Sequence, residues 1–263
     1  MAAAYDSFDY PAYWIGREYE HKSEIIAIKA FLHRIQKIKN LLEIGAGFGR
    51  LTPLYFYRAK KVVLSDPSSK LLRLARDVFS DKTNIKYIHS SLENLPNRIR
   101  PKTQDLIIMV RVLHHIKDID LAFDVLRSLL KDGGYLILEF ANKQNLKSTL
   151  REFLKGNLTF PIDISTTDKR SKKSLKNCSL PFFNFHPGKI DEILANHGFD
   201  LIEKRSVSNI RHRLFKRIFS PELLLYFEKH TQKFFSLFDI GPSIFLLLKG
   251  VLEISVRLNA NKS

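Results

Sequence analysis

The residues best placed to do chemistry lie in one short stretch, where an apolar run ends in an acid and glycines then recur at every second position. The stretch covers residues 41–49 and reads Leu-Leu-Glu-Ile-Gly-Ala-Gly-Phe-Gly. Because glycine has no Cβ, Gly45, Gly47 and Gly49 can bring the backbone close to a bound ligand. An apolar strand that breaks into such a loop before a helix-forming stretch predicts a site for a nucleotide-like cofactor.

Residue 50 excludes two of the cofactor classes that use glycine loops. A P-loop requires Gly-Lys-Ser/Thr after its glycines, but Gly49 is followed by Arg50 and Leu51. A dinucleotide loop places its last glycine at position 50, which Arg50 occupies. The third class that we considered is S-adenosylmethionine.

The loop resembles the first motif of class I S-adenosylmethionine-dependent methyltransferases, in particular the quinone and small-molecule type. That motif runs acid-x-Gly-x-Gly-x-Gly, and Glu43 and the three glycines fill it. The resemblance implies that residues 43–49, Ala46 among them, hold the cofactor. Glu43 would place negative charge near its cationic end, directly or through water. The N-terminus of a helix expected over residues 49–57 would favour its carboxylate.

A second acid, Asp66, ends the next apolar stretch. A carboxylate at the carboxyl edge of the predicted sheet can accept hydrogen bonds from both ribose hydroxyls. The position matches the second motif of the same methyltransferases, and Pro67 resembles the residue that often follows it. The alternative is that Asp66 only caps the next helix. The upstream glycine loop favours ribose binding.

A third motif covers residues 90–96, which read Ser-Ser-Leu-Glu-Asn-Leu-Pro. It is similar to a Gly-Asp-Ala-Glu-x-Leu-Pro stretch that contacts adenine in these methyltransferases. Ser91 stands where the family usually has Asp, so its hydroxyl would bind the adenine edge more weakly than a carboxylate. The backbone around Leu92 is also expected to contact adenine.

Two histidines follow the fourth predicted strand, in a stretch that resembles the family's Leu-x-His-Ile. His115 occupies the family's usual histidine position, and His114 precedes it. Either could act as a general base or orient the acceptor, or both could be structural residues beneath the cofactor loop. Arg111, at the same strand end, is expected to contact the cofactor. Two adjacent histidines without further ligands make a poor metal site, so no metal is expected.

These residues are positioned by strands that alternate with helices, a pattern typical of a doubly wound, mostly parallel α/β sheet with helices on both faces. The resemblance implies seven strands, with the last one reversed. Strands are predicted at residues 41–44, 61–66, 85–89, 105–110, 135–140, 199–204 and 243–248. Helices are predicted at 22–38 and 49–57, after Pro67, across Ala122–Leu129, near 148–154, at 187–196 and from Ser220. The helix after Pro67 is expected to bury Leu71, Leu74, Ala75 and Val78.

Segments outside this pattern are expected to form a cap over the site. Residues 1–21 are aromatic and would pack as an arm or as a flap over the cofactor, and the polar, basic stretch that includes Lys169–Lys173 reads as a lid. The predicted organisation is an N-terminal arm and helix (1–38), a Rossmann-like core (39–142), a basic lid (143–184), a C-terminal part with a Phe-rich helix (185–255) and a tail (256–263).

Composition limits the partners and the compartment. The net charge of +16 indicates either an anionic partner, such as an acidic substrate, an acidic lipid or nucleic acid, or simply a basic, solvated surface. The single cysteine, Cys178, fits a reducing compartment. No signal peptide and no apolar stretch long enough to span a bilayer are visible, so we expect a cytoplasmic protein. Peripheral membrane contact stays open, and the oligomeric state is not indicated.

The function expected from the sequence is methyl transfer from S-adenosylmethionine to a small-molecule acceptor, anionic or lipid-like in character. Two alternatives remain: a nucleic-acid methyltransferase, which the charge favours although no Asn-Pro-Pro-Tyr-type motif follows the fourth strand, and a non-catalytic cofactor-binding protein of the same fold.

Overall fold

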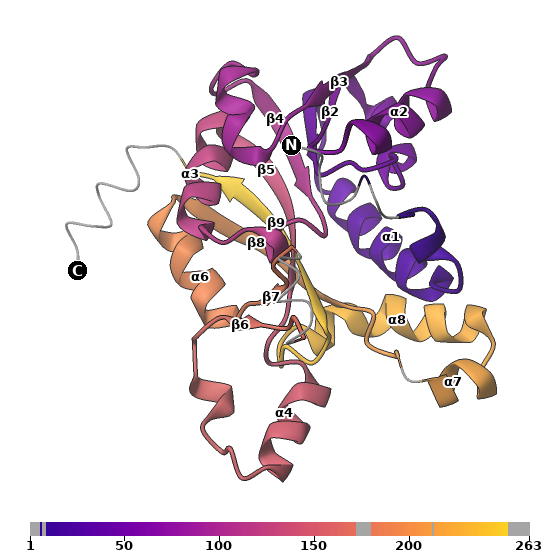
Figure 1. Cartoon of the computed structure of the whole chain (residues 1–263), viewed down its shortest axis with the longest axis vertical. Helices are drawn as coiled ribbons and strands as arrows, with labels where there is room; N and C mark the ends of the chain where they lie inside the picture. The colour runs from indigo at the N-terminus through magenta and orange to yellow at the C-terminus, as the bar shows by residue number, and fades with distance from the viewer. Residues whose placement is uncertain (1–5, 7–8, 172–179, 212, 252–263) are drawn as a thin grey trace.

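The sheet has seven strands in the order β3-β2-β1-β4-β5-β9-β8 (Figure 1). The computed structural model describes residues 6, 9–171, 180–211 and 213–251. Strand β9 runs antiparallel to both of its neighbours, and the others are parallel. The predicted seven-stranded, mostly parallel sheet is therefore confirmed. The strands are β1 (Ile38–Ile44), β2 (Ala59–Asp66), β3 (Ile85–His89), β4 (Gln104–Met109), β5 (Leu130–Ala141), β8 (Phe199–Val207) and β9 (Ser243–Gly250).

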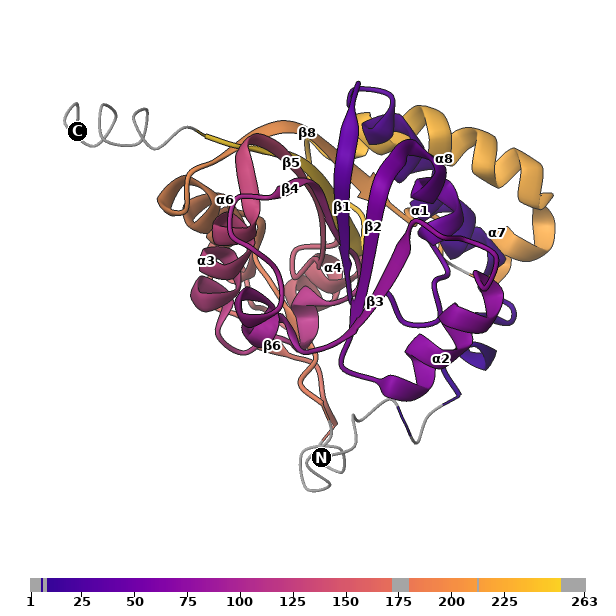
Figure 2. The ribbon, with the colours of Figure 1, turned by 90° about the horizontal axis from the view of Figure 1, so that it is seen from above.

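Helices cover both faces of this sheet. Seen from above, α3 and α6 lie on one side, and α1, α2 and α8 lie on the other (Figure 2). The α-helices are α1 (Glu18–Leu32), α2 (Ser69–Val78), α3 (Ile119–Leu129), α4 (Leu146–Leu154), α6 (Pro187–Asn196), α7 (Arg213–Ile218) and α8 (Pro221–Phe235). Several start as their sequences predict, because Ser68 and Ser220 accept hydrogen bonds from the backbone N–H groups of the first turn.

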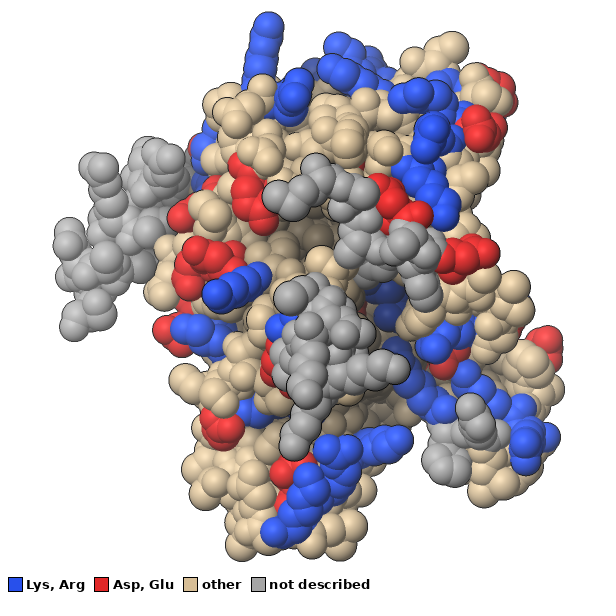
Figure 3. Space-filling model, in the orientation of Figure 1, with Lys and Arg blue, Asp and Glu red and all other residues tan. Residues whose placement is uncertain are grey.

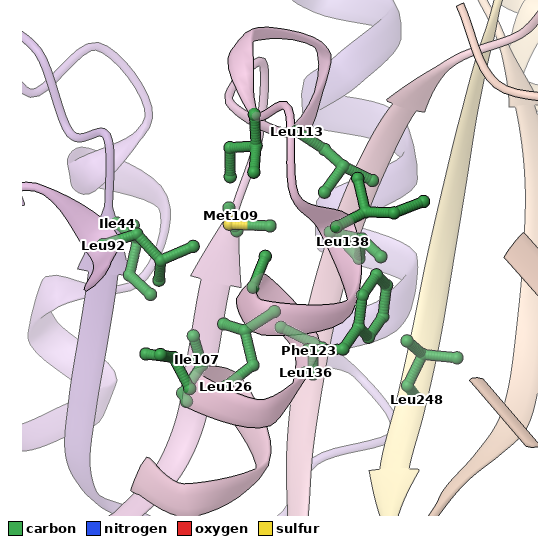
Figure 4. Close-up of a cluster of buried hydrophobic side chains, with 14 of the residues drawn as sticks. Ile44, Leu92, Ile107, Met109, Leu113, Phe123, Leu126, Leu136, Leu138 and Leu248 are labelled. Carbon is green, nitrogen blue, oxygen red and sulfur yellow. The ribbon is translucent and has the colours of Figure 1, made fainter. Parts of the chain in front are cut away.

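Each face of the sheet has its own apolar core, because successive side chains of a strand point to opposite faces. Ile44, Ile107 and Met109 pack beneath α3 (Figure 4). Leu41, Ile108 and residues of α1 form the second core. Burial on both faces explains why the central strands are apolar throughout.

The register of the strands places the ends of β1, β2 and β4 side by side at one edge of the sheet. Ile44 at the end of β1 pairs with Ser65 of β2 on one side and with Met109 of β4 on the other. Gly45, Asp66 and Val110 therefore emerge together at the carboxyl edge, where open α/β sheets bind their ligands.

The prediction of a helix over residues 49–57 is wrong. The chain forms two short 3-10 turns instead, η3 (Thr52–Leu54) and η4 (Phe56–Arg58). Pro53 has no N–H to donate, and the Thr52 side chain is bound to Glu43. No helix N-terminus of useful length therefore follows the glycine loop.

The inner face predicted for α2 is partly wrong. Leu71 and Ala75 are buried as expected, but Leu72 accompanies them, whereas Leu74 and Val78 are exposed. The helix is thus rotated relative to the predicted face.

Residues 143–171 and 180–184 leave the sheet at the end of β5 and contain α4, the turn η7 (Phe160–Ile162) and a small hairpin of β6 (Thr167–Asp168) and β7 (Phe183–Asn184). Lys143 is buried, and its ammonium group donates to the carboxylate of Asp163 and the carbonyl of Ser165, which holds this insertion to the core. Residues 172–179, with Cys178 and the end of the basic run, and the tail at 256–263 lie outside the described residues. Across the described ranges no helix is both long and apolar enough to cross a bilayer.

Candidate functional site

A cavity of about 250 Å³ lies at the carboxyl ends of β1, β2 and β4 and opens to solvent. It brings together six of the predicted site residues, which are Gly45, Gly47, Asp66, Pro67, Arg111 and His115. The other lining residues are Tyr10, Leu71, Val110, Val112 and Leu180. The remaining predicted residues, Glu43, Ala46, Gly49, Ser91, Leu92 and His114, do not line it.

The glycine loop needs glycine for both conformation and space. Gly45 has a φ of +71°, and a Cβ built on it would lie 2.2 Å from Cγ2 of Val112. Gly49 has a φ of +79°, and its Cβ would lie 2.5 Å from the ring of Phe79. The turn is held to the sheet because the N–H groups of Gly45 and Ala46 both donate to the carbonyl of Ser65. The loop is therefore a backbone cradle that a side chain would fill.

Asp66 points its carboxylate into this edge of the cavity. One oxygen accepts from the N–H of Gly47 and the other from the N–H of Ser68, each at 2.8 Å. Burial raises the pKa of Asp66, and these two hydrogen bonds oppose the rise. Each carboxylate oxygen can accept more than one hydrogen bond, so a pair of hydroxyl donors in the cavity would find acceptors here. Ser68 Oγ also caps α2, a role that the alternative interpretation had given to Asp66.

Glu43 lies behind the glycine loop. Its carboxylate accepts a hydrogen bond from Thr52 Oγ1 at 2.7 Å. Burial raises its pKa to about 7, although the bond from Thr52 acts in the opposite direction. The contact with Thr52 gives Glu43 a role in holding η3 against β1, and its predicted influence on the cofactor stays a prediction.

The predicted adenine contacts stay untested. Ser91 precedes the turn η5 (Leu92–Asn97), and its Oγ accepts from the side-chain amide of Asn94 at 3.0 Å. Leu92 packs in the core beneath α3.

The two histidines differ in their surroundings. His115, in the turn η6 (Leu113–His115), lines the cavity, and its Nδ1 lies 2.7 Å from the carbonyl of Pro181. A bond to that carbonyl places the proton on Nδ1, which makes Nε2 the basic nitrogen. Burial lowers the pKa of His115, so the ring is neutral at pH 7.

His114 is buried behind it, and its tilted ring lies with its centroid 4.0 Å from that of His115 and 4.6 Å from that of Phe182. Burial also lowers its pKa, and to a greater degree. Its position fits the structural alternative. Within the described ranges, no group of three or more His, Cys, Asp or Glu side chains could hold a metal ion.

A buried ion network supports the loop and the end of β4. Glu24 of α1 binds Arg50 at 2.6 Å through one oxygen and Arg111 at 2.5 Å through the other. These guanidinium groups lower the pKa of Glu24 against the effect of its burial. Arg111 has a φ of +59°, and its N–H donates to Glu139 at 2.8 Å.

The sequence analysis missed Glu24 and Glu139 as residues that position the site. The available signal was that Glu20 and Glu24 fall on the same face of α1 as Ala27 and Ile28, where an acid requires a partner.

The N-terminal arm lies against the glycine loop. Tyr10 lines the cavity, and a Cβ on Gly47 would lie 3.6 Å from its ring. Trp14, in the turn η2 (Ala12–Trp14), stacks over the guanidinium of Arg50 at 3.5 Å. Residues 9–17 of the predicted arm therefore lie beside the glycine loop, whereas residues 18–21 already belong to α1.

Part of the sequence resembles known methyltransferases. Residues 42–138 match the family model described as a methyltransferase domain. A ubiquinone/menaquinone biosynthesis C-methyltransferase, UbiE, from Teredinibacter turnerae is 32% identical over 112 residues, which cover 40% of this chain and 44% of the relative. A probable polyketide synthase of Dictyostelium discoideum is 27% identical over 146 residues, 47% of this chain and 6% of the synthase. The chain thus spans less than half the length of these relatives.

Solved structures share the fold. An S-adenosylmethionine-dependent methyltransferase from Mesorhizobium loti superposes with a TM-score of 0.56 and 17% identity, covering 85% of this chain and 95% of the other. One from Thermotoga maritima superposes with a TM-score of 0.60 and 18% identity, covering 94% and 97%.

Proposed function

We propose that the protein transfers a methyl group from S-adenosylmethionine to a small acceptor that is anionic or lipid-like, since residues 42–138 match the methyltransferase-domain family model. The observation that carries the proposal is the convergence of the glycine loop, Asp66, Arg111 and His115 on one cavity. When bound, the cofactor supplies an electrophilic methyl group on its sulfonium.

The residues of the cavity fit this cofactor. Asp66 would accept hydrogen bonds from the two ribose hydroxyls, since its carboxylate retains acceptor capacity. The backbone of Gly45 and Gly47 would contact the ligand where a Cβ would otherwise lie. Arg111, rather than the missing helix N-terminus, would face its carboxylate, since the N–H groups of Gly45, Ala46 and Gly47 already donate to Ser65 and Asp66. Tyr10 and Leu71 would exclude water from the reacting atoms.

Arg111 in the cavity lining, together with Arg211, supports an anionic acceptor. Arg211, in the loop after β8, is exposed and makes no hydrogen bond or ion pair with any described residue. Glu24 already neutralises Arg50 and Arg111 in part. Arg211 therefore remains available for an acceptor carboxylate or phosphate.

His115 would accept the proton of an O–H or N–H acceptor through Nε2. Its neutral state at pH 7 suits a base, and its bond to Pro181 orients the ring. Relatives named for quinone and polyketide synthesis support an acceptor with an apolar carbon skeleton.

The test is transfer of labelled methyl from S-adenosylmethionine to fractionated anionic metabolites and lipids. We expect label in one of these fractions, a loss of rate of roughly 10²-fold or more in His115→Asn, and wild-type rate in Asp200→Asn, an exposed acid on β8. The wild-type rate should fall only below the ordinary histidine pKa of 6.5, and His115→Asn should lose this acidic limb. Because a lowered histidine pKa also reduces stability below pH 6.5, circular dichroism must show folded protein at each pH. Absence of label from all fractions would contradict the proposal.

A further inference from the structure

The outward face of α8 is apolar and its inward face is polar, the reverse of an ordinary surface helix. On the inward side, Glu228 accepts a hydrogen bond from the Tyr19 hydroxyl at 2.6 Å, and the Gln232 amide donates to the carbonyl of Ser23 at 2.9 Å. On the outward side, the exposed apolar residues Leu223, Tyr226, Phe227, Phe234 and Leu237 form a stripe, with His230 in the interval between Phe227 and Phe234. Tyr226 and Phe234 are 60% and 57% exposed.

The short helix α7 extends this stripe. Leu214, Ile218 and Phe219 are exposed, and the rings of Phe215 and Phe219 stack at 6.3 Å. Lys216 fixes α7 to α1 through an ion pair of 2.7 Å with Glu20. We call the exposed apolar residues of α7 and α8, from Leu214 to Leu237, the aromatic ledge.

Basic side chains border the aromatic ledge. Arg217, Lys229 and Lys233 are exposed and form no ion pair with any described residue. Figure 3 shows Lys and Arg gathered over α7. Helices that combine Phe, Tyr and Leu on one face with flanking Lys and Arg are typical of segments that lie in the headgroup region of a bilayer.

Helix α4 also combines exposed apolar side chains with basic ones. Leu150, Phe153 and Leu154 are exposed on one side, accompanied by Lys147 and Arg151. It follows the carboxyl end of β5, and α7 follows the carboxyl end of β8, which is parallel to β5. Both insertions therefore project from the sheet edge that carries the cavity, and Figure 1 shows α4, α7 and α8 at its lower end.

We propose that the aromatic ledge docks on the surface of an anionic lipid bilayer, with α4 as a second contact, so that the cavity meets an acceptor held in or at the membrane. This deepens the proposed function by naming the source of the acceptor, and it rests on that function for that part. A second copy of the chain is a poorer occupant, because a two-fold interface would bring Arg217, Lys229 and Lys233 of both copies together in a protein of net charge +16.

The experiment is co-sedimentation of the full chain with vesicles, without cofactor. We expect binding roughly tenfold tighter to an equal mixture of phosphatidylcholine and phosphatidylglycerol than to phosphatidylcholine alone, decreasing at high salt. The double substitution Phe227→Ser and Phe234→Ser should weaken this binding at least tenfold, as should Lys229→Glu with Lys233→Glu. All four side chains are exposed, so the melting temperature should not change.

The matched control is Val78→Ser, which removes an exposed apolar side chain from α2 and should bind as the wild type does. Equal binding of wild type to both kinds of vesicle, or unchanged binding of the double variants, would overturn the proposal. So would a dimer in light scattering that the Phe227→Ser and Phe234→Ser substitutions dissociate, since a second copy would then cover the ledge. Because the assay contains no cofactor, its failure leaves the test of methyl transfer unaffected.

Discussion

At Gly45, one missing methyl group decides whether the loop can form. Its φ of +71° disfavours any L side chain, and Val112 Cγ2 lies 2.2 Å from where a Cβ would be. Gly45→Ala should therefore lower the free energy of unfolding by about 2–4 kcal/mol, the sum of backbone strain and overpacking. It should also weaken cofactor binding, because the loop must shift.

Gly156→Ala is the matched control for this substitution. Gly156 has a φ of +82° but no heavy atom within 4 Å of an added Cβ, so only the strain of about 1 kcal/mol should remain. Urea unfolding measures both variants. Equal destabilisation of the two would show that contact with Val112 is not the cause.

At the residue scale, the sequence was most informative where chemistry demands one residue type. Gly45, Gly47 and Asp66 were predicted from motif spacing and do line the cavity. Glu43 fills the same motif, yet its carboxylate binds Thr52 behind the loop. A motif shows that an acid is present, but the direction of its side chain depends on packing that spacing does not encode.

A buried carboxylate joins helix α1 to the site. Glu24 neutralises Arg50 beside the glycine loop and Arg111 at the end of β4. Glu24→Gln would leave two guanidinium groups without their counterion, and we expect a loss of about 3 kcal/mol or more of unfolding free energy.

The comparison for Glu24→Gln is Glu152→Gln on α4. Glu152 pairs with Lys155 at the surface, so its substitution should leave stability unchanged within error. Chemical denaturation of both variants decides the matter. Wild-type stability in Glu24→Gln would contradict the role assigned to the network.

Elements with strong periodicity were predicted well, and irregular ones were not. The central strands and α3 follow from long apolar patterns, and Ala122, Val125 and Leu126 are buried as expected. Residues 49–57 looked helical because their composition is apolar, but Pro53 and the bond between Thr52 and Glu43 stop a helix there. The small β6–β7 hairpin gave no signal, since each of its strands has only two residues.

For the whole molecule, alternation of strands and helices was enough to predict the sheet, because two-sided burial makes each parallel strand apolar. The cap was predicted only because its segments do not follow the alternation of strands and helices. Its Phe-rich helix was predicted without an assigned inner face, and only the structure shows that Glu228 and Gln232 face inward. A polar helix face can be buried when it forms hydrogen bonds with residues such as Tyr19. Tyr19 is far away in the sequence, so a local sequence pattern does not predict this contact.

The central claim is that the cavity at the ends of β1, β2 and β4 binds S-adenosylmethionine through Asp66. Isothermal titration calorimetry with its demethylated product tests this most directly, because it requires no acceptor. We predict one site per chain, and at least tenfold weaker binding in Asp66→Ala and Asp66→Asn. Asp200→Asn should bind as the wild type does. Folded wild-type protein that gives no heat of binding, or Asp66→Ala that binds as tightly as wild type, would contradict the account.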